Sequence, residues 1–179
     1  MSNHYFIGIK IPLHIARSLV EQRESWGTVS HRKIPDAEDL HITLVFIGAD
    51  PLDEIDAAIE ALEKIEHRTF ELAVTGSDFF GKVERPRVVF AAVEENESLN
   101  ELQVKVRNAI QDFGMKPDTK PFVPHITLAN KWAGEEIWTE IPPIKPEQFR
   151  INEFSLFRID PGGKPRYVAL KTYKLKDGE

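Results

Sequence analysis

One tetrapeptide, His-Ile-Thr-Leu, occurs twice in this chain. It occupies residues 41–44 and appears again, 84 positions later, at residues 125–128. Side chains alternate between the two faces of an extended segment, so His and Thr point one way while Ile and Leu point the other. Each copy therefore predicts a strand with one polar face and one apolar face that packs against a core.

The segments that precede the two copies also match. Each copy follows a strand-forming run and then a helical stripe of apolar residues. These segments are residues 5–11 and 13–26 before the first copy, and residues 88–93 and 99–113 before the second. The interval from the first strand to the histidine is 35 residues in one case and 36 in the other. This agreement predicts an internal duplication, with strand–helix–strand repeats at about residues 4–48 and 86–131.

Four further elements follow from the pattern of apolar residues. They are an amphipathic helix at residues 52–65 and strands at residues 70–75, 149–159 and 166–175. The last two strands are joined by the turn sequence Asp160–Gly163, which predicts a C-terminal hairpin over about residues 149–175. Residues 31–36 form a polar connection. We expect an α+β fold in which residues 1–179 make one domain.

The composition limits the classes of function. No cysteine is present, which excludes disulfides, thiolate metal ligands and cysteine nucleophiles. The net charge of −6 argues against a protein that coats long nucleic acids, because such binding depends on clustered Lys and Arg. A small anionic substrate, or one end of an RNA, fits if a few cations line a cleft. With no long apolar stretch and no N-terminal secretion signal, we expect a cytoplasmic protein that does not associate with membranes.

The duplicated strands carry groups that suit acid–base chemistry. If a pseudo-twofold axis relates the repeats, His41 and His125 face each other across the groove between them. Because the ordinary pKa of an imidazole is about 6.5, one can deprotonate a nucleophile while the other protonates a leaving oxygen, as phosphodiester cleavage requires. Thr43 and Thr127, on the same face, can donate hydrogen bonds to nonbridging phosphate oxygens. This chemistry requires no metal ion and no other cofactor.

Other interpretations of these residues are weaker. A single His-x-Thr would be structural, and only the duplication favours a function. A metal site would need further ligands, and the carboxylates at residues 36, 38 and 39 have no counterpart before the second copy. Gly162-Gly163-Lys164 lacks the rest of a phosphate-binding loop. We expect no catalytic role for the remaining histidines, which are His4, His14, His31 and His67.

Two His-x-Thr-hydrophobic motifs about 80 residues apart, in duplicated strand–helix–strand units, resemble the two-histidine (2H) phosphoesterase superfamily. Within it the chain resembles the bacterial and archaeal RNA 2′,3′-cyclic phosphodiesterases, once named 2′-5′ RNA ligases. The similar segments cover nearly the whole chain and are residues 5–9, 40–48, 85–90 and 124–128. The two histidine motifs carry the resemblance, and the other segments add to it.

The resemblance implies a bilobal α+β fold, with two pseudo-symmetric lobes that each have a mainly antiparallel sheet and flanking helices around a central cleft. It implies that His125 activates water, that His41 protonates the departing ribose oxygen, and that Thr43 and Thr127 hold the phosphate. The implied partners are RNA ends or small nucleotides that carry a 2′,3′-cyclic phosphate, and the implied product is a 2′-phosphate. A weak 2′-5′ ligation would be the reverse reaction. The residues alone leave open which histidine performs which step.

The chain departs from its relatives at two places. Many relatives have an Arg two positions beyond the last hydrophobic residue of the second motif, where this chain has Asn130 followed by Lys131. Relatives often carry a basic-Trp pair before the first motif, and the counterpart here is Lys33 with Ile34. Lys131 can replace the missing cation if the strand bulges or ends there, since it otherwise faces away from the histidines.

Aromatic and basic side chains supply the remaining candidates. Phe6 and Phe80 are candidates for stacking on a nucleobase, with a place in the core as the alternative for each. The cations that could steer an RNA end, with a solvated surface as the alternative, are Lys82, Arg85, Arg87 and Arg166. We expect a monomeric enzyme. The alternative function is a non-catalytic module that binds an RNA end or a nucleotide.

Overall fold

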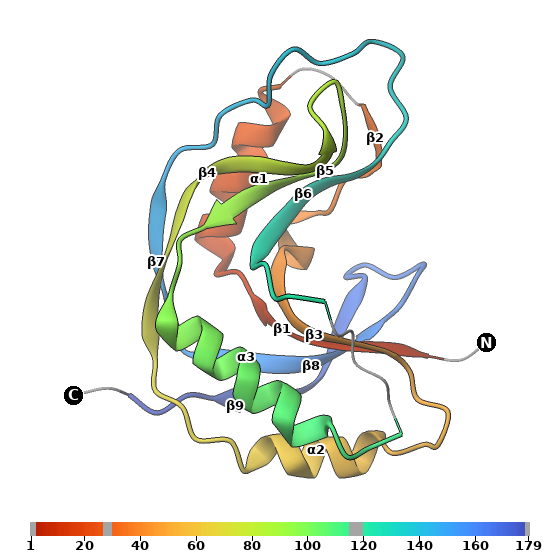
Figure 1. The fold of residues 1–179 in the computed structure, drawn as a ribbon, viewed down its shortest axis with the longest axis vertical. Coiled ribbons are helices and arrows are strands. Elements are labelled where there is room, and N and C mark those ends of the chain that lie inside the picture. The colour runs from red at the N-terminus through yellow and green to blue at the C-terminus, as the bar shows by residue number, and fades with distance from the viewer. Residues whose placement is uncertain (1–2, 27–29, 115–119, 178–179) are drawn as a thin grey trace.

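The structure is a computed structural model that describes residues 3–26, 30–114 and 120–177. Within these ranges a mainly antiparallel sheet is accompanied by α-helices, which confirms the α+β prediction (Figure 1). The helices are α1 (Leu13–Glu24), α2 (Ile55–Glu63), α3 (Glu97–Ile110) and the short 3₁₀ helix η1 (Ala37–Asp39). The strands are β1 (His4–Lys10), β2 (His31–Lys33), β3 (His41–Ala49), β4 (Phe70–Lys82), β5 (Arg85–Val93), β6 (His125–Trp132), β7 (Glu147–Ile151), β8 (Glu153–Ile159) and β9 (Tyr167–Lys174). No helix in the described ranges is long and apolar enough to cross a membrane.

The sheet has two halves that meet at the repeated tetrapeptides. The strand order is β7-β4-β5-β6-β3-β1-β8-β9, with β2 paired to β6 beside this path. We call β3, β1, β8 and β9 the first half-sheet, and β6, β5, β4 and β7 the second half-sheet. Strands β3 and β6 join them through one antiparallel residue pair, Ile42 opposite Ile126. Beside the junction, β1 pairs with β3 as β5 pairs with β6, which matches the order of the predicted repeats.

Both junction strands carry a bulge at the leucine of the tetrapeptide. Leu44 has no partner in the β1–β3 ladder, and Leu128 has none in the β5–β6 ladder. A bulge adds one residue to a strand and so shifts the alternation of side chains beyond it. The residues that follow the leucines, Val45 and Ala129, are accordingly buried like the leucines themselves.

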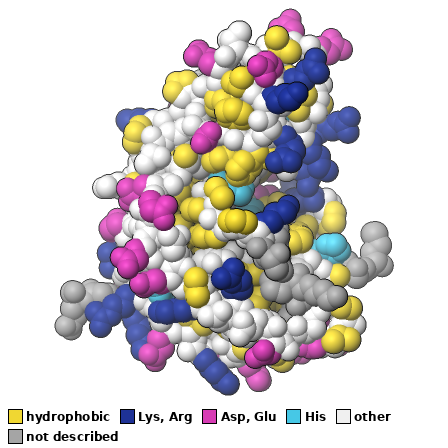
Figure 2. Space-filling view, viewed as in Figure 1, with side chains coloured by type: hydrophobic (Ala, Val, Ile, Leu, Met, Phe, Trp, Pro, Cys, Tyr) yellow, Lys and Arg dark blue, Asp and Glu magenta, His cyan; other side chains and the backbone are white. Residues whose placement is uncertain are grey.

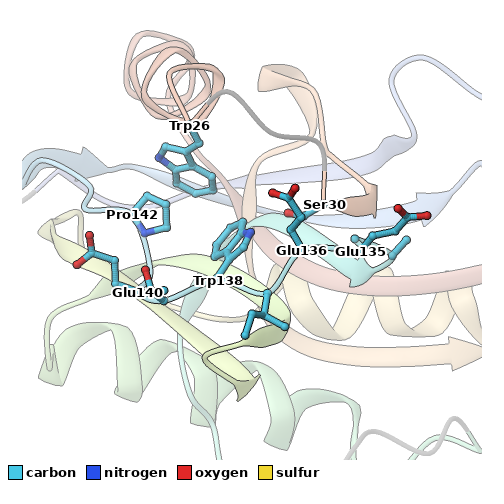
Figure 3. Close-up of a pocket in the computed structure, with 11 residues that line it drawn as sticks. Trp26, Ser30, Glu135, Glu136, Trp138, Glu140 and Pro142 are labelled. Atoms are coloured by element: carbon cyan, nitrogen blue, oxygen red, sulfur yellow. The ribbon is translucent and has the colours of Figure 1, made fainter.

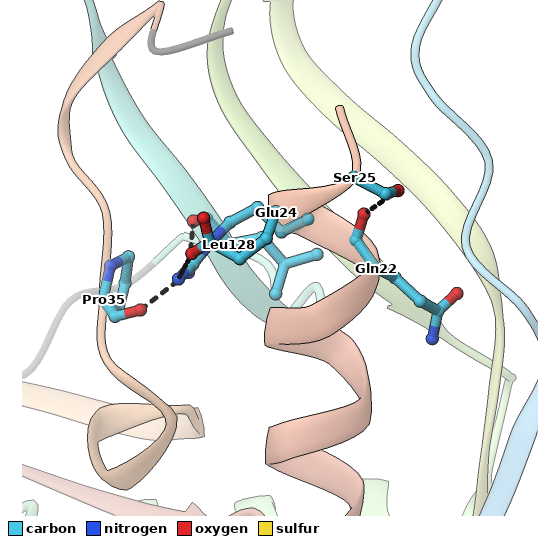
Figure 4. A network of polar contacts seen from close by, with 6 residues as sticks. Gln22, Glu24, Ser25, Pro35 and Leu128 are labelled. Carbon is cyan, nitrogen blue, oxygen red and sulfur yellow. Dashed lines mark hydrogen bonds and ion pairs between the residues drawn. The ribbon is translucent and has the colours of Figure 1, made fainter. Parts of the chain in front are cut away.

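A helix from the opposite repeat satisfies the carbonyl oxygen at each bulge. Arg23 of α1 donates from Nη1 to the Leu128 carbonyl at 3.1 Å and to the Pro35 carbonyl at 2.6 Å (Figure 4). Gln103 of α3 donates from Nε2 to the Leu44 carbonyl at 3.3 Å. Both side chains are buried, and the helices contact the strands that their side chains bind. Helix α1 of the first repeat thus fixes β6 of the second, and helix α3 of the second repeat fixes β3 of the first.

Three predictions for the first half of the chain are wrong, and they concern β2, the end of β4 and the start of α2. Residues 31–33, expected in a polar connection, form β2 against β6, because a strand this short is defined by its partner and not by its own pattern. Strand β4 extends beyond residue 75 because β5 pairs with it as far as Lys82. Helix α2 begins at Ile55, where the Asp50 carboxylate accepts hydrogen bonds from the backbone N–H of Glu54 and Ile55 at 2.9 and 2.8 Å.

The strand predicted at residues 149–159 is two strands in different half-sheets. Strand β7 pairs with β4, whereas β8 pairs with β1. The apolar positions change phase across Asn152 and Glu153, from residues 149 and 151 to residues 154 and 156, which is the signal for the break. Strands β8 and β9 pair antiparallel, so the predicted C-terminal hairpin is present but begins later, at Glu153.

Replacing Arg23 with Met tests whether the helix side chain holds the junction. The substitution should lower the free energy of unfolding by roughly 2–4 kcal/mol, because the buried Leu128 carbonyl and the half-buried Pro35 carbonyl lose their donor. Urea denaturation measures the change. Arg17→Met, at an exposed position of the same helix, should cost less than about 0.5 kcal/mol. Equal stability of the two variants would contradict this role of Arg23.

Candidate active site

The junction pair places four motif side chains on one face. Ile42 and Ile126 are fully buried, so the residues beside them point toward the opposite face of the sheet. In an antiparallel pair the residue before one partner lies across from the residue after the other. His41 therefore lies across from Thr127, and Thr43 lies across from His125. The predicted convergence of the two motifs follows from this register.

A backbone carbonyl fixes the same tautomer in both histidines. His41 Nδ1 lies 2.8 Å from the Asp39 carbonyl oxygen, and His125 Nδ1 lies 2.7 Å from the Val123 carbonyl oxygen. A carbonyl only accepts hydrogen bonds, so each Nδ1 carries the proton and each neutral ring keeps Nε2 free as a base. At His41 this Nε2 is 3.1 Å from the Thr43 hydroxyl, which donates to the neutral ring.

Each imidazole also packs against two aromatic rings. The ring of His41 lies 4.7 Å from that of Phe6 and 4.8 Å from that of Tyr167. The ring of His125 lies 5.1 Å from those of Phe80 and Phe90. These contacts hold each ring in one orientation on its strand.

Two of these aromatic residues were not predicted as part of the site. Phe90 precedes His125 by 35 residues, which is the interval from Phe6 to His41, so the repeat itself could have identified it. Tyr167 reaches His41 from β9, and no sequence pattern links the two. The backbone N–H groups of Arg166 and Tyr167 donate to the Asp39 carboxylate at 3.1 to 3.4 Å, which ties this hairpin to the residue whose carbonyl orients His41.

Burial sets the protonation of the pair. It lowers the pKa of both His41 and His125 below the ordinary value of 6.5, and the proximity of His125 lowers the pKa of His41 further. The hydrogen bonds to the two carbonyls partly oppose this shift. Both rings are therefore mainly neutral at neutral pH, and a bound anion would favour the return of a proton to one of them.

A pocket of about 520 Å³ opens beside the histidine pair. It is lined by Thr43 and His125, by the aromatic rings of Phe46, Phe80 and Phe122, and by the cations Arg87 and Lys120. In the space-filling view, histidine lies in a hollow with Lys and Arg side chains along one side (Figure 2). The size and the mixture of aromatic and cationic groups suit a nucleotide.

A second pocket lies apart from the motif residues. It has a volume of about 630 Å³, and Trp26, Trp138 and three glutamates line it (Figure 3). None of the four motif side chains contributes to this pocket. Its negatively charged rim does not suit an anionic substrate, so we place the candidate site at the histidine pair.

Comparison with known proteins identifies the family of the chain. The profile of the 2′-5′ RNA ligase superfamily matches residues 11–163. The RNA 2′,3′-cyclic phosphodiesterase of Bacillus subtilis (strain 168) is 30% identical over 176 residues, which cover 96% of each protein. The chain belongs to the 2′-5′ RNA ligase superfamily.

Solved structures share the fold of this superfamily member. TT0787 of Thermus thermophilus gives a TM-score of 0.83 at 26% identity, over 98% of this chain and 100% of that one. Escherichia coli LigT complexed with 3′-AMP gives a TM-score of 0.81 at 24% identity, over 98% and 99% of the two chains. These matches confirm the 2H phosphoesterase fold that the motifs predicted.

The two residues predicted to contact a nucleobase, Phe6 and Phe80, differ in their exposure. Phe6 is only 2% exposed and packs between Phe157 and His41, so it supports the His41 ring and offers no face to a base. Its predicted contact with a nucleobase is wrong, because β1 is covered on both faces. Phe80 is half-buried and lines the pocket next to His125, where a base can reach it.

The premise of the Lys131 prediction was wrong, because strict alternation places residues 125, 127 and 131 on one face and the bulge at Leu128 moves Lys131 off it. Beyond Leu128 the shifted alternation places Asn130, and not Lys131, on the face of the histidines. Lys131 is exposed and has a positive φ of 62°. Lys33 of β2 pairs across from Asn130 and therefore shares its face. Among the other candidate cations, Arg87 lines the pocket, whereas Lys82 and Arg85 are exposed at the β4–β5 turn.

The other histidines lie outside the site. His31 and His67 are buried, and His4 and His14 are exposed. His31 Nε2 donates to the Pro86 carbonyl at 2.7 Å, and His67 Nε2 lies 3.0 Å from the Ser98 hydroxyl, so both serve the packing. Within the described ranges no three His, Asp or Glu side chains gather in a way that could hold a metal ion.

An NMR titration of the imidazole protons tests the electrostatics of the pair. The signals of His41 and His125 should titrate below pH 6.5, because burial disfavours the charged rings and lowers the pKa of each. Inorganic phosphate should raise at least one of the two midpoints, because an anion in the site favours an imidazolium. Midpoints above 6.5 in the absence of phosphate, or midpoints that phosphate leaves unchanged, would contradict the assignment.

Proposed function

We propose that this chain hydrolyses 2′,3′-cyclic phosphates, at RNA ends or on nucleotides, to 2′-phosphomonoesters without a metal ion. The observation that carries the proposal is the pairing of Ile42 with Ile126, which brings two His-x-Thr faces together. Relatives named RNA 2′,3′-cyclic phosphodiesterase in Bacillus subtilis and Escherichia coli support this substrate. Reversal of the same chemistry would be a weak 2′-5′ ligation, and we place the reaction in the cytoplasm with a monomeric enzyme.

In the proposed reaction the two histidines exchange protons through Nε2. Neutral His125 takes a proton from a water molecule as the water oxygen attacks phosphorus. Protonated His41 gives a proton to the 3′ oxygen as the bond between phosphorus and that oxygen breaks. The products are a 2′-phosphomonoester and a free 3′-hydroxyl, and proton exchange with solvent restores both rings. The carbonyl bonds at both Nδ1 atoms support this use of Nε2.

The surroundings of the two rings support the assignment of roles. His125 lines the open pocket, where a water molecule can approach it. His41 lies between Phe6 and Tyr167, where few water molecules compete for its proton. Thr43 and Thr127, one pleat away from the histidines, would donate hydrogen bonds to the nonbridging oxygens on which charge accumulates. In this pose the base of the terminal nucleotide occupies the pocket beside Phe80.

Alanine substitutions test the catalytic pair. His41→Ala and His125→Ala should each lower the turnover of 2′,3′-cyclic AMP by roughly 10²- to 10⁴-fold, since each removes one proton transfer. His14→Ala, an exposed histidine at the start of α1, should keep full activity. Chromatography of the products should show 2′-AMP, and EDTA should leave the rate unchanged. A double variant of His41 and His125 that retains full activity would exclude the mechanism.

A substrate with a good leaving group separates the two roles. A p-nitrophenyl phosphodiester releases a stable phenolate that needs no protonation, so His41→Ala should lose much less activity on it than on the cyclic nucleotide. His125→Ala should lose roughly as much on both substrates, because water must still be activated. The opposite pattern would exchange the roles of the two histidines. Binding of 2′,3′-cyclic AMP without any turnover would instead support the non-catalytic module.

A further inference from the structure

Three cations gather at one end of the histidine pair. Lys33 comes from β2, Lys131 from the end of β6, and Arg166 from the turn before β9. Burial lowers the pKa of the Lys33 ammonium, and the charges of Arg166 and Lys131 lower it further, so both lie within electrostatic reach of Lys33. We call these residues the cationic edge.

Strand geometry directs Lys33 of the cationic edge toward the face of the histidines. The bulge at Leu128 turns Asn130 to the face of Thr127, and Lys33 lies across from Asn130 in the β2–β6 pair. The guanidinium carbon of Arg166 lies 6.0 Å from the centroid of the Tyr167 ring, and that ring packs on His41. The cationic edge therefore adjoins His41 and Thr127, whereas the pocket is lined by Thr43 and His125 at the opposite end of the junction pair.

The positive charges of the cationic edge are not neutralised by the protein. Within residues 3–26, 30–114 and 120–177, none of its three members makes an ion pair. Cations near the C-terminus do make such pairs, with Lys174 bound to Glu153 and Lys176 to Glu66. The Asp39 carboxylate accepts the backbone N–H groups of Arg166 and Tyr167 and forms no ion pair with the guanidinium, so it balances the positive charge of the edge only in part.

The guanidinium of Arg166 has spare hydrogen-bonding capacity. Its Nη1 donates to the Pro161 carbonyl at 3.2 Å, but its Nε is buried and has no partner among the described residues. Like charges held together repel one another, and a bound anion relieves that repulsion. The His and Thr side chains already account for one phosphate, so the cationic edge has room for a second.

We propose that the cationic edge binds the phosphodiester immediately 5′ of the nucleotide that carries the cyclic phosphate. The inference rests on the proposed function and narrows its substrate class to oligonucleotides. The terminal base enters the pocket beside Phe80, and the chain leaves past Lys33 and Arg166. On the face of the histidines, β6 presents the side-chain amide of Asn130. Lys33 of β2 lies across from Asn130 and supplies positive charge on that face.

A comparison of two substrates tests the second phosphate site. 2′,3′-Cyclic AMP lacks the 5′ phosphodiester, whereas a diadenosine dinucleotide with a terminal 2′,3′-cyclic phosphate has it. Lys33→Ala should lower kcat/KM for the dinucleotide about tenfold or more and change that for cyclic AMP by less than about twofold, because a charge-assisted contact is lost on one substrate only. The dependence of kcat/KM for the dinucleotide on salt concentration should become weaker, because salt screens the ionic contact that the substitution removes.

Matched variants distinguish a phosphate contact from a structural role. Lys33→Arg should keep the preference for the dinucleotide, since it keeps the charge. Lys145→Ala, an exposed lysine before β7, should change neither substrate. Equal losses on both substrates in Lys33→Ala, or no loss on the dinucleotide, would overturn the proposal.

Equilibrium binding separates this inference from the proposed reaction. If the unmodified protein hydrolyses neither substrate, the proposed function fails, and calorimetric titration still tests the site. The probes are 3′-AMP and a diadenosine dinucleotide with a terminal 3′-phosphate. Tighter binding of the dinucleotide that Lys33→Ala abolishes would support the second phosphate site, and equal affinities for the two probes would overturn it.

Discussion

Two hydrogen bonds from buried helix side chains hold the strands on which the site is built. Arg23 and Gln103 each reach across to the carbonyl oxygen at a bulge in the other half-sheet. Without these donors, a polar backbone atom would be buried without a partner at each bulge. The bulges in turn decide which residues beyond the tetrapeptides face the substrate, so the pocket and the cationic edge depend on the same two contacts.

The sequence predicted the centre of the site because a strand has a side-chain period of two. His41, Thr43 and their counterparts in the second copy needed only this alternation and the repeat. The bulges at Leu44 and Leu128 interrupt this alternation directly after each threonine. Leu128 and Ala129 are adjacent apolar residues, and that adjacency is the trace of the shift, but only the pairing with β5 shows that Asn130 returns to the catalytic face.

Other parts of the site depend on contacts between distant segments and have no local signal. Tyr167 reaches His41 from β9, and Lys33 lies across from Asn130 on β2, and the positions of both strands are set by their partner strands. Phe6 was expected at a base and instead supports His41, because an aromatic residue on a strand has the same pattern whether a ligand or the core covers it. Phe90 was predictable from the 35-residue interval, which shows that the repeat held more information than its motif.

The central claim is that both imidazoles act on one phosphate through Nε2. The most direct measurement is a crystal structure of the protein with 2′-AMP, the proposed product. Phosphate oxygens should lie within hydrogen-bond distance of Nε2 of His41, Nε2 of His125 and the hydroxyls of Thr43 and Thr127. A phosphate bound to only one histidine, or one held elsewhere on the surface, would contradict it.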